Sequence, residues 1–226
     1  DLLVNTSASP FSVGKPAFRE NLFAGHVTDH ERWLVFANQV GGNDELIFDG
    51  RSFVVAPDGT LACRLAAFEE DFAVYDVPLD AISADASSGT ATVDTAGKTT
   101  DGPTLTDQQG DATAEIWAAI VLGLQDYVRK SGFNDVVVGL SGGIDSAVTT
   151  AIAADALGSE SALAVGMPTR YTSDESEEDA RSVAANLEIE FRDIPIENTF
   201  KAFETQLAAT LDAGASVTEE NIQARI

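Results

Sequence analysis

The sequence contains a single cysteine, Cys63, so no disulfide can form within the chain. A reducing, cytoplasmic setting is therefore expected. Histidine occurs only twice, and methionine once. No apolar run approaches the roughly 18 residues that span a bilayer, and no signal-peptide pattern opens the chain. We therefore expect no membrane partner.

Basic residues are scarce, because 13 Lys and Arg stand against 37 Asp and Glu, a formal net charge of −24. Only four of the basic residues are lysines. Binding to a nucleic-acid backbone needs clustered Lys and Arg, so no nucleic-acid partner is expected. The acidic residues are scattered along the chain. We interpret them as a solvated surface suited to a high-salt, halophilic cytoplasm, in which screening weakens self-repulsion.

The apolar content is sufficient for one large domain or two smaller ones, since 44% of the 226 residues are hydrophobic. The chain opens without Met in an apolar run that predicts a strand, and we interpret it as a fragment. Residues 1–82 alternate short apolar runs with turn signals, and a helix is predicted over 16–32. Residues 83–110 are rich in Ser, Thr, Asp, Ala and Gly, which predicts a linker.

Residues 111–226 alternate helices and strands in a regular rhythm, which predicts a doubly wound parallel sheet. The first helix carries apolar residues at helical spacing, among them Ile116, Ile120 and Tyr127. The β-branched run 136–138 predicts a strand buried on both faces. Thr172 and Glu175 have the spacing of a capping box at the start of a later helix.

A Gly-Ser loop joins this buried strand to the next helix. Its glycines allow a tight turn and close approach of a ligand, and its N–H groups, with the helix dipole, favour a polyphosphate. Asp145 would offer an oxygen ligand to phosphate-bound Mg²⁺. The loop comprises Gly139, Leu140, Ser141, Gly142, Gly143, Ile144, Asp145 and Ser146.

The loop is not a Walker A sequence, because it has no Gly-Lys-Ser/Thr element. Without that lysine, cleavage between the α- and β-phosphates is favoured over transfer of the γ-phosphoryl group. The alternative is an ordinary strand-to-helix turn. The complete string Ser-Gly-Gly-Ile-Asp-Ser after a predicted buried strand favours nucleotide binding over that alternative.

Ser-Gly-Gly-x-Asp-Ser is the signature of the ATP-pyrophosphatase superfamily, and the segments that follow resemble one branch of it. Residues 167–173 (Met-Pro-Thr-Arg-Tyr-Thr-Ser), 178–180 and 194–196 resemble the synthetase domain of NAD⁺ synthetases, and 218–226 resemble its substrate-binding helix. Residues 5–15 and 38–50 resemble the late part of a nitrilase-type glutaminase domain. This order of domains is that of the glutamine-dependent NAD⁺ synthetases.

This resemblance implies an α/β chain in which part of a nitrilase-like α-β-β-α layer (1–82) and a linker (83–110) precede part of an ATP-pyrophosphatase domain (111–226). It implies a ligase that adenylates deamido-NAD⁺ with ATP and Mg²⁺, then amidates it with ammonia from glutamine. A homo-oligomer is implied for the full-length enzyme. The implied roles are ATP binding by 139–146, Met167 and Arg170, metal binding by Asp145, deamido-NAD⁺ binding by Asn221, and glutamine binding by Ser9 and Lys15.

Nitrilase-type glutaminases use a Glu-Lys-Cys triad, which we expect upstream of Asp1, so no catalytic residue is assigned in this chain. Cys63 follows a turn in an apolar setting and is interpreted as a small core residue. The fragment alone is expected to lack glutaminase activity and to have little or no synthetase activity. Two other functions stay open: another ATP-pyrophosphatase amidotransferase, such as a GMP-synthetase-like enzyme, and a non-catalytic nucleotide-binding module.

His26 and His30 have helical spacing, but without a third ligand they are interpreted as surface residues. The acidic residues Glu175, Glu177 and Glu178 are interpreted as solvated first-turn residues of a helix. Phe191, Phe200 and Phe203 are interpreted as core residues.

Overall fold

The computed structural model describes residues 2–78, 91–95, 98–101 and 111–207. The chain divides into two compact units, Asp1–Tyr127 and Val128–Ile226, and the division falls inside helix α2 (Ala112–Lys130). The predicted linker lies largely outside the described residues. Its described parts form strands β8 (Ala91–Thr95) and β9 (Lys98–Asp101), which pair as a hairpin and join the short strand β7 (Val74–Tyr75).

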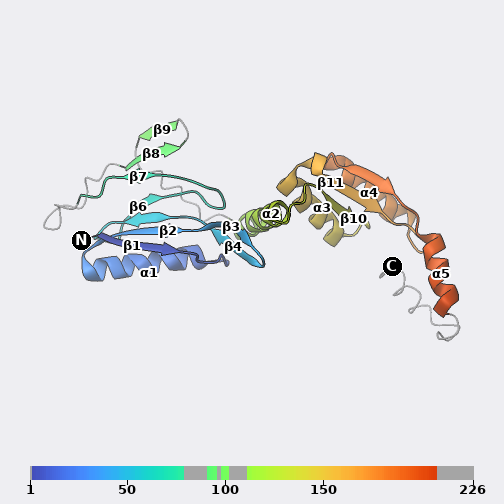
Figure 1. The fold of residues 1–226 in the computed structure, drawn as a ribbon, viewed down its shortest axis with the longest axis horizontal. Helices are drawn as coiled ribbons and strands as arrows, with labels where there is room; N and C mark the ends of the chain where they lie inside the picture. Colours follow the sequence, from blue (N-terminus) through green and yellow to red (C-terminus); the bar gives the residue numbers. More distant parts are fainter. Residues whose placement is uncertain (1, 79–90, 96–97, 102–110, 208–226) are drawn as a thin grey trace. The chain divides into compact units, whose positions relative to one another are not determined.

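The first unit is built on a four-stranded sheet in the order β1-β2-β5-β6, with α1 along one face (Figure 1). β1 and β2 are parallel, since α1 returns the chain between them, and β5 and β6 add antiparallel partners. The elements are β1 (Leu2–Ser7), α1 (Lys15–His30), β2 (Trp33–Asn38), β5 (Phe53–Val55) and β6 (Leu61–Arg64). These strands and this helix confirm the predicted segments, and the α/β layer is confirmed.

Side chains of this sheet alternate between two cores, as the period of a strand requires. Leu34 and Phe36 pack with Val27 of α1 on one face. Trp33 packs with Cys63 on the other face. Cys63 is buried, and burial raises the pKa of its thiol, with a smaller contribution from Asp71. This burial confirms that Cys63 is a core residue. The raised pKa also makes its thiol a poor nucleophile.

A second small sheet was not predicted. Strands β3 (Val40–Asn43) and β4 (Leu46–Asp49) form an antiparallel hairpin. The Gly-Gly and Asn-Asp pairs in this stretch have low strand propensity, which hides the hairpin in the sequence. Helix α2 packs against this hairpin. The Gly42 N–H donates to Asp126 Oδ2 at 2.8 Å, and a Cβ on Gly42 would lie 3.1 Å from the Gly123 Cα.

Helix α2 forms as predicted, but its packing face differs from the apolar face expected from spacing. Ile116, Ile120 and Tyr127 of the predicted face are exposed and Val128 of that face is buried, while Ala119 and Asp126, outside it, are buried. Gly123 lets the helix approach the β3–β4 hairpin closely, so small size and the Asp126 hydrogen bond select the face that meets the hairpin.

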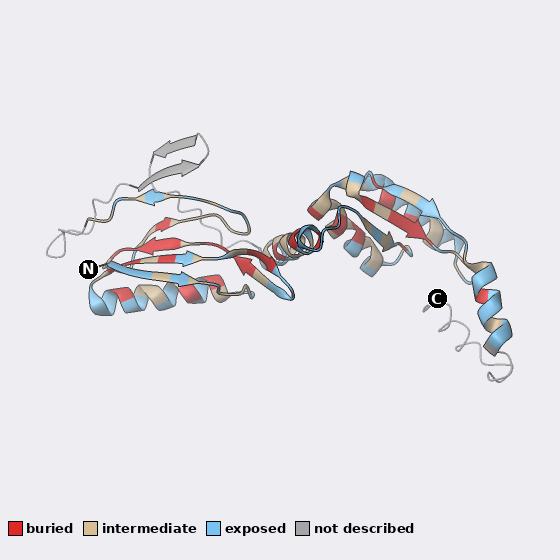
Figure 2. Ribbon diagram, viewed as in Figure 1, coloured by how far each residue is buried: buried red, intermediate tan, exposed pale blue. Residues whose placement is uncertain are grey.

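The second unit contains a three-stranded parallel sheet in the order β10-β11-β12. Leu140 and Ala164 of the sheet region pack with Ala180 and Ala184 of α4. Figure 2 shows the buried residues concentrated along β11, the middle strand. The elements are β10 (Val136–Gly139), α3 (Ile144–Leu157), a 3₁₀ turn (Ser159–Ser161), β11 (Ala162–Gly166), α4 (Asp174–Asn186), β12 (Glu190–Asp193) and α5 (Glu197–Leu207). This confirms the predicted parallel-sheet domain.

Three local predictions in this unit were wrong. β10 is not buried on both faces, since Val137 is 67% exposed; among the described strands β10 is an edge strand that pairs with β11 alone. Helix α4 is capped by Ser173, whose hydroxyl accepts the Ser176 N–H, and not by Thr172, whose hydroxyl accepts the Thr169 N–H instead. Phe203 is exposed on α5, while Phe200 is fully buried.

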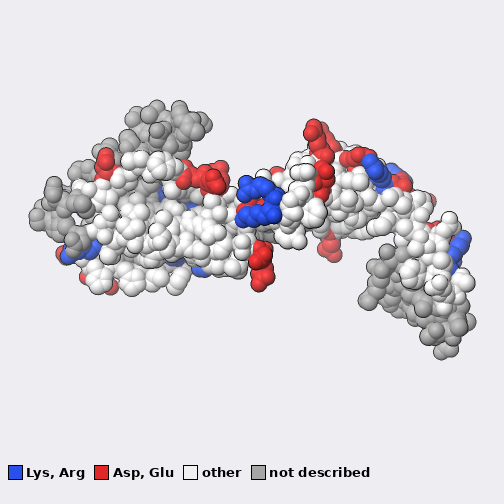
Figure 3. Space-filling model, in the orientation of Figure 1, with Lys and Arg blue, Asp and Glu red and all other residues white. Residues whose placement is uncertain are grey.

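No helix in the described part of the chain combines the length and apolar character needed to cross a bilayer. Acidic side chains are spread over the visible surface of both units, in keeping with the excess of Asp and Glu (Figure 3). Asp174, Glu175 and Glu177 lie in the first turn of α4, where the helix dipole favours negative charge.

Candidate functional sites

The predicted nucleotide loop lies at the carboxyl end of β10. The Leu140 N–H donates to the carbonyl of Val165 at 2.9 Å, which extends the β10–β11 pairing by one step. Leu140 is buried in the core of the second unit, so the loop starts from a fixed point. Beyond it, α3 begins at Ile144.

Gly142 fits the loop because it has no side chain. Its φ is +81°, a conformation that L-residues rarely adopt, and a Cβ there would lie 2.3 Å from the backbone oxygen of Ser176 on α4. Gly143 is different: its φ is −79°, and an added Cβ would meet only Ser141 Oγ, at 3.5 Å. Of the two glycines, Gly142 is the one that the fold itself requires.

The start of α3 presents backbone N–H groups of the kind that bind an anion. Gly143 is the N-cap residue and, being glycine, provides no side-chain cap, so the first-turn N–H groups face outward. Ser141 Oγ and Ser146 Oγ lie 3.1 Å apart, and Ser146 also donates to the Gly143 carbonyl at 2.9 Å. Asp145 is exposed in the first helical turn. The structure thus brings donors and one carboxylate to a single helix terminus.

Met167 lies beside this loop. It follows β11 directly, and its terminal methyl would be 3.2 Å from a Cβ placed on Gly139. Met167 is 47% exposed and offers an apolar surface beside the loop 139–146, which we call the cradle. The structure therefore brings Met167 and Gly139 together, as expected from two neighbouring parallel strands whose carboxyl ends share an edge.

Arg170 is held by α5. Its Nε donates to Glu197 Oε1 at 2.9 Å, its backbone N–H donates to the other Glu197 oxygen at 3.1 Å, and its Nη2 reaches Glu204 at 3.3 Å. The guanidinium also lies over the Phe200 ring, 5.4 Å from the centroid. The side-chain and backbone hydrogen bonds from Arg170 lower the pKa of Glu197 from 4.5 to about 2. Arg170 therefore fixes α5 to the segment after β11.

Replacement of Arg170 by alanine is expected to return the pKa of Glu197 toward 4.5. Because the folded-state pKa is depressed, the Glu197 contribution to stability is present above pH 4.5 and is lost as the pH falls through about 2. A ¹³C NMR titration of the glutamate carboxyls measures this directly. Arg181→Ala is the matched control, because Arg181 pairs with Asp193 and Glu177 instead. A Glu197 pKa unchanged in Arg170→Ala would contradict the assignment.

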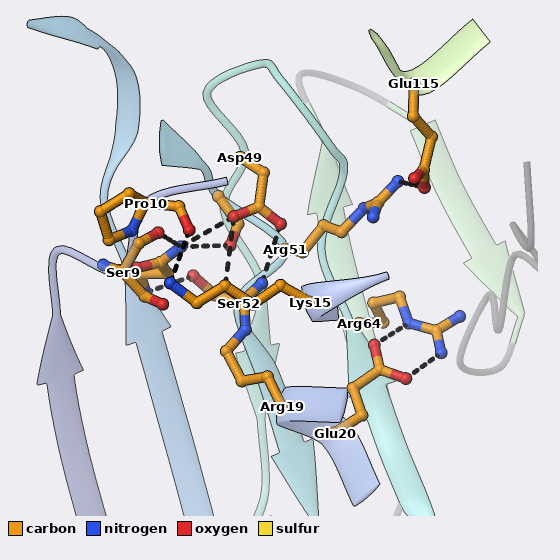
Figure 4. A network of polar contacts seen from close by, with 12 residues as sticks. Ser9, Pro10, Lys15, Arg19, Glu20, Asp49, Arg51, Ser52, Arg64 and Glu115 are labelled. Atoms are coloured by element: carbon orange, nitrogen blue, oxygen red, sulfur yellow. Dashed lines mark hydrogen bonds and ion pairs between the residues drawn. The ribbon is translucent and has the colours of Figure 1, made fainter. Parts of the chain in front are cut away.

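Ser9, predicted for glutamine binding, lies on the loop between β1 and α1, and Lys15, predicted for the same role, is the first residue of α1 (Figure 4). The Ser9 N–H donates to Asn38 Oδ1 at 2.8 Å, and Lys15 Nζ donates to the Pro10 carbonyl at 2.7 Å. The Phe11 N–H donates to the carbonyl of Ile47 at 2.7 Å, which attaches the loop to β4.

Sequence reasoning missed the buried ion pair behind this loop. Asp49, fully buried, accepts from both Nη atoms of Arg19 at 2.8 and 3.1 Å, and the Asn38 amide donates to the same carboxylate at 3.3 Å. Arg19 also lies over the Phe36 ring, 5.1 Å from its centroid. The only sequence signal is a charged residue next to the apolar run 46–48 and another on the inner face of α1.

Beside this pair the first unit contains a cavity of about 260 Å³, lined in part by Asn38, Ser52 and Arg51. Arg51 forms an ion pair with Glu115 of α2, and both side chains are largely buried. Asn38 therefore contributes to the loop contacts and to the cavity wall alike.

The remaining predicted residues do not join these sites. His26 and His30 are exposed on α1, as predicted for surface residues. Within the described ranges, no three His, Cys, Asp or Glu side chains gather as a metal-binding group. Asn221 lies outside the described residues, so its role stays a prediction.

Comparison with known proteins agrees with both halves of the chain. A family model described as carbon-nitrogen hydrolase matches residues 1–86, and one described as NAD synthase matches residues 116–226. Glutamine-dependent NAD(+) synthetases from Aquifex aeolicus and Synechocystis sp. are 40% and 41% identical over the whole chain. The chain belongs to the glutamine-dependent NAD⁺ synthetase family.

Solved structures of this family have the same fold. A glutamine-dependent NAD⁺ synthetase from Acinetobacter baumannii, solved in complex with ADP, superposes with a TM-score of 0.83 at 36% identity over 100% of this chain. The chain covers 40% of that protein, and 42% and 38% of the Aquifex and Synechocystis proteins. It thus spans well under half of the family members that it matches.

Proposed function

We propose that the protein containing this chain converts deamido-NAD⁺ to NAD⁺ with ATP and glutamine. The nicotinate carboxylate attacks the α-phosphorus of ATP and pyrophosphate leaves. Ammonia released from glutamine then attacks the acyl carbon, and AMP leaves. The protein is proposed to be a carbon–nitrogen ligase that uses ATP, deamido-NAD⁺ and glutamine as substrates.

The arrangement at the end of β10 carries this proposal. The Gly142 turn, two hydroxyls and an uncapped helix start converge on one exposed edge of a parallel sheet, where such folds bind ligands. Fixed N–H donors there would stabilise negative charge as pyrophosphate departs. We assign the ATP phosphates to residues 139–146, with Met167 against the base. Arg170 would fix the adjoining segment and lie near the nucleotide.

Asp145 is proposed to hold Mg²⁺. Its exposed carboxylate in the first turn of α3 is a hard oxygen donor beside the proposed phosphate cradle. Mg²⁺ in nucleotide sites commonly takes one or two carboxylates and completes its shell with phosphate oxygens and water. A single protein carboxylate therefore fits the ion. When bound, Mg²⁺ neutralises charge on the phosphates.

The other assignments follow the family. Ser9 and Lys15 are proposed to bind glutamine, and Asn221 to bind deamido-NAD⁺. We place the domain boundaries at 1–82, 83–110 and 111–226, with support from the two matching family models. A cytoplasmic setting and a homo-oligomer are also proposed for the full-length enzyme; mass photometry of that enzyme tests the second.

Asp145→Ala is expected to lower pyrophosphate release by about 100-fold, because one group that stabilises developing charge is lost. The assay uses the full-length enzyme with ATP and Mg²⁺, with and without deamido-NAD⁺. Asp155→Ala is the control, since Asp155 is also exposed on α3 but near its far end. Release in the parent should depend strictly on deamido-NAD⁺.

Release triggered by xanthosine monophosphate instead would favour a GMP-synthetase-like enzyme, and release without any acceptor would also overturn the proposal. The same assay repeated with and without molar KCl tests the high-salt adaptation that we propose from the net charge of −24. Equal activity and equal stability in both buffers would contradict that adaptation.

A further inference from the structure

We propose that Asn38, fixed by the buried Asp49–Arg19 pair, is the positioning residue of the glutamine site. It holds the backbone of Ser9 in place without touching the substrate itself. This inference rests on the proposed function, because it assumes that the Ser9–Lys15 loop binds glutamine.

The side-chain amide of Asn38 contacts both the backbone N–H and the backbone carbonyl of Ser9. Its Oδ1 accepts the Ser9 N–H at 2.8 Å, and its Nδ2 lies 3.4 Å from the Ser9 carbonyl. Nδ2 also donates to the Gly50 carbonyl at 3.0 Å and to Asp49 Oδ1 at 3.3 Å. Only an amide offers an acceptor and two N–H donors in this arrangement. The donor at Ser9 also fixes the orientation of the amide, because a flipped amide would face two donors toward each other.

The Asp49–Arg19 ion pair holds the Asn38 amide in a fixed position. Asp49 is fully buried, and Arg19 is only 5% exposed. Two parallel N–H···O contacts between a guanidinium and a carboxylate fix both direction and distance. Asp49 Oδ1 serves Arg19 and Asn38 at once, so the orientation of Asn38 depends on the pair.

Helix α1 connects the Asp49–Arg19 pair to Lys15, the other residue predicted to bind glutamine. Lys15 opens α1, and Arg19 follows one helical turn later on the same face. Lys15 holds the Pro10 carbonyl while Arg19 holds Asp49. Ser9 is therefore connected to the Asp49–Arg19 pair through Asn38, and Lys15 is connected to it through α1. We call Asn38, Asp49 and Arg19 the frame; it sets the distance between Ser9 and Lys15.

The hairpin β3–β4 completes the frame. Asn38 ends β2 just before the hairpin, and Asp49 is its last residue. Pro10 forms an isolated antiparallel bridge with Phe48, so the loop lies along the same strand that presents Asp49. With the amide of Asn38 removed, the loop keeps this bridge but loses its fixation at Ser9. Small displacements of a binding group are costly, on the order of 100-fold per ångström in sensitive cases.

The test measures glutamate release from glutamine and pyrophosphate release with deamido-NAD⁺ in the same full-length enzyme. Asn38→Ala is expected to raise the KM for glutamine by about 10-fold or more, with a smaller change in kcat and nearly unchanged pyrophosphate release at saturating glutamine. Asn38→Asp is expected not to rescue, because it loses both N–H donors and sets a second carboxylate against Asp49. Gln39→Ala is the matched control, since its exposed side chain takes no part in the frame.

A parental KM for glutamine in Asn38→Ala would overturn the inference. So would a loss of kcat at constant KM with weakened hydrogen-exchange protection of β2 and β5, since that pattern marks a purely structural residue. A parent enzyme without pyrophosphate release that depends on deamido-NAD⁺ would instead refute the proposed function. The two failures are therefore distinguishable.

Discussion

Gly142→Ala is expected to lower the free energy of unfolding of the second unit by about 2–5 kcal/mol and to abolish release of pyrophosphate. The residue has φ of +81°, which costs a non-glycine residue roughly 1–2 kcal/mol. Its new Cβ would lie 2.3 Å from the Ser176 oxygen, which is backbone and cannot rotate away. Overpacking adds about 1–3 kcal/mol. Relief of the clash would move α4 away from the loop and distort the cradle.

Two glycines separate these causes. Gly158→Ala introduces a residue at φ of +85° with no atom within 4 Å, so it reports the backbone strain alone. Gly143→Ala meets only Ser141 Oγ at 3.5 Å and has a negative φ, so it should fold like the parent. Hydrogen exchange of peptides from α3 and β11 in increasing urea measures each variant. Equal effects of Gly142→Ala and Gly158→Ala would show that contact with Ser176 is unimportant.

Asp49→Ala is expected to destabilise the first unit by about 3–5 kcal/mol. Removal of the carboxylate leaves the guanidinium of Arg19 buried without its partner, and Arg19 Nε already makes no hydrogen bond. A buried charge without compensation is far more costly than a lost surface pair, which is worth at most about 1 kcal/mol. The loop that carries Ser9 should become mobile as well.

The matched control for Asp49→Ala is Glu20→Ala. Glu20 pairs with Arg64 at 2.6 Å, but both side chains are about one-fifth exposed, so water can replace the partner. Hydrogen exchange of peptides from β2 and β5 reports the first unit by itself. Similar losses of protection in the two variants would show that burial of the Asp49–Arg19 pair has no special importance.

Local sequence patterns predicted the features that depend only on residues close together in the chain. The loop 139–146 is continuous in sequence, so its glycines, hydroxyls and carboxylate are legible without a fold. Strand and helix periods likewise placed α1, β2 and β11 close to their observed bounds. The core position of Cys63 followed from its apolar neighbours.

Predictions failed where partners are distant. β10 has the composition of a buried strand, yet Val137 is exposed because among the described strands only β11 pairs with β10. The inner face of α2 follows Ala119 and Asp126, because the partner is a glycine-containing hairpin that no local pattern reveals. Thr172 and Ser173 both suit a helix cap, and the path of the chain after β11 selects the second.

The sequence by itself determined the family, the order of the two domains and the Gly-Ser loop 139–146, since these depend on residue types at short, fixed spacings. The tertiary structure alone decided how the loop that carries Ser9 is held. Asn38, Asp49 and Arg19 are far apart along the chain and meet only when β2, β4 and α1 pack together. A buried charge is stable only beside its partner, and that partner is chosen by the fold.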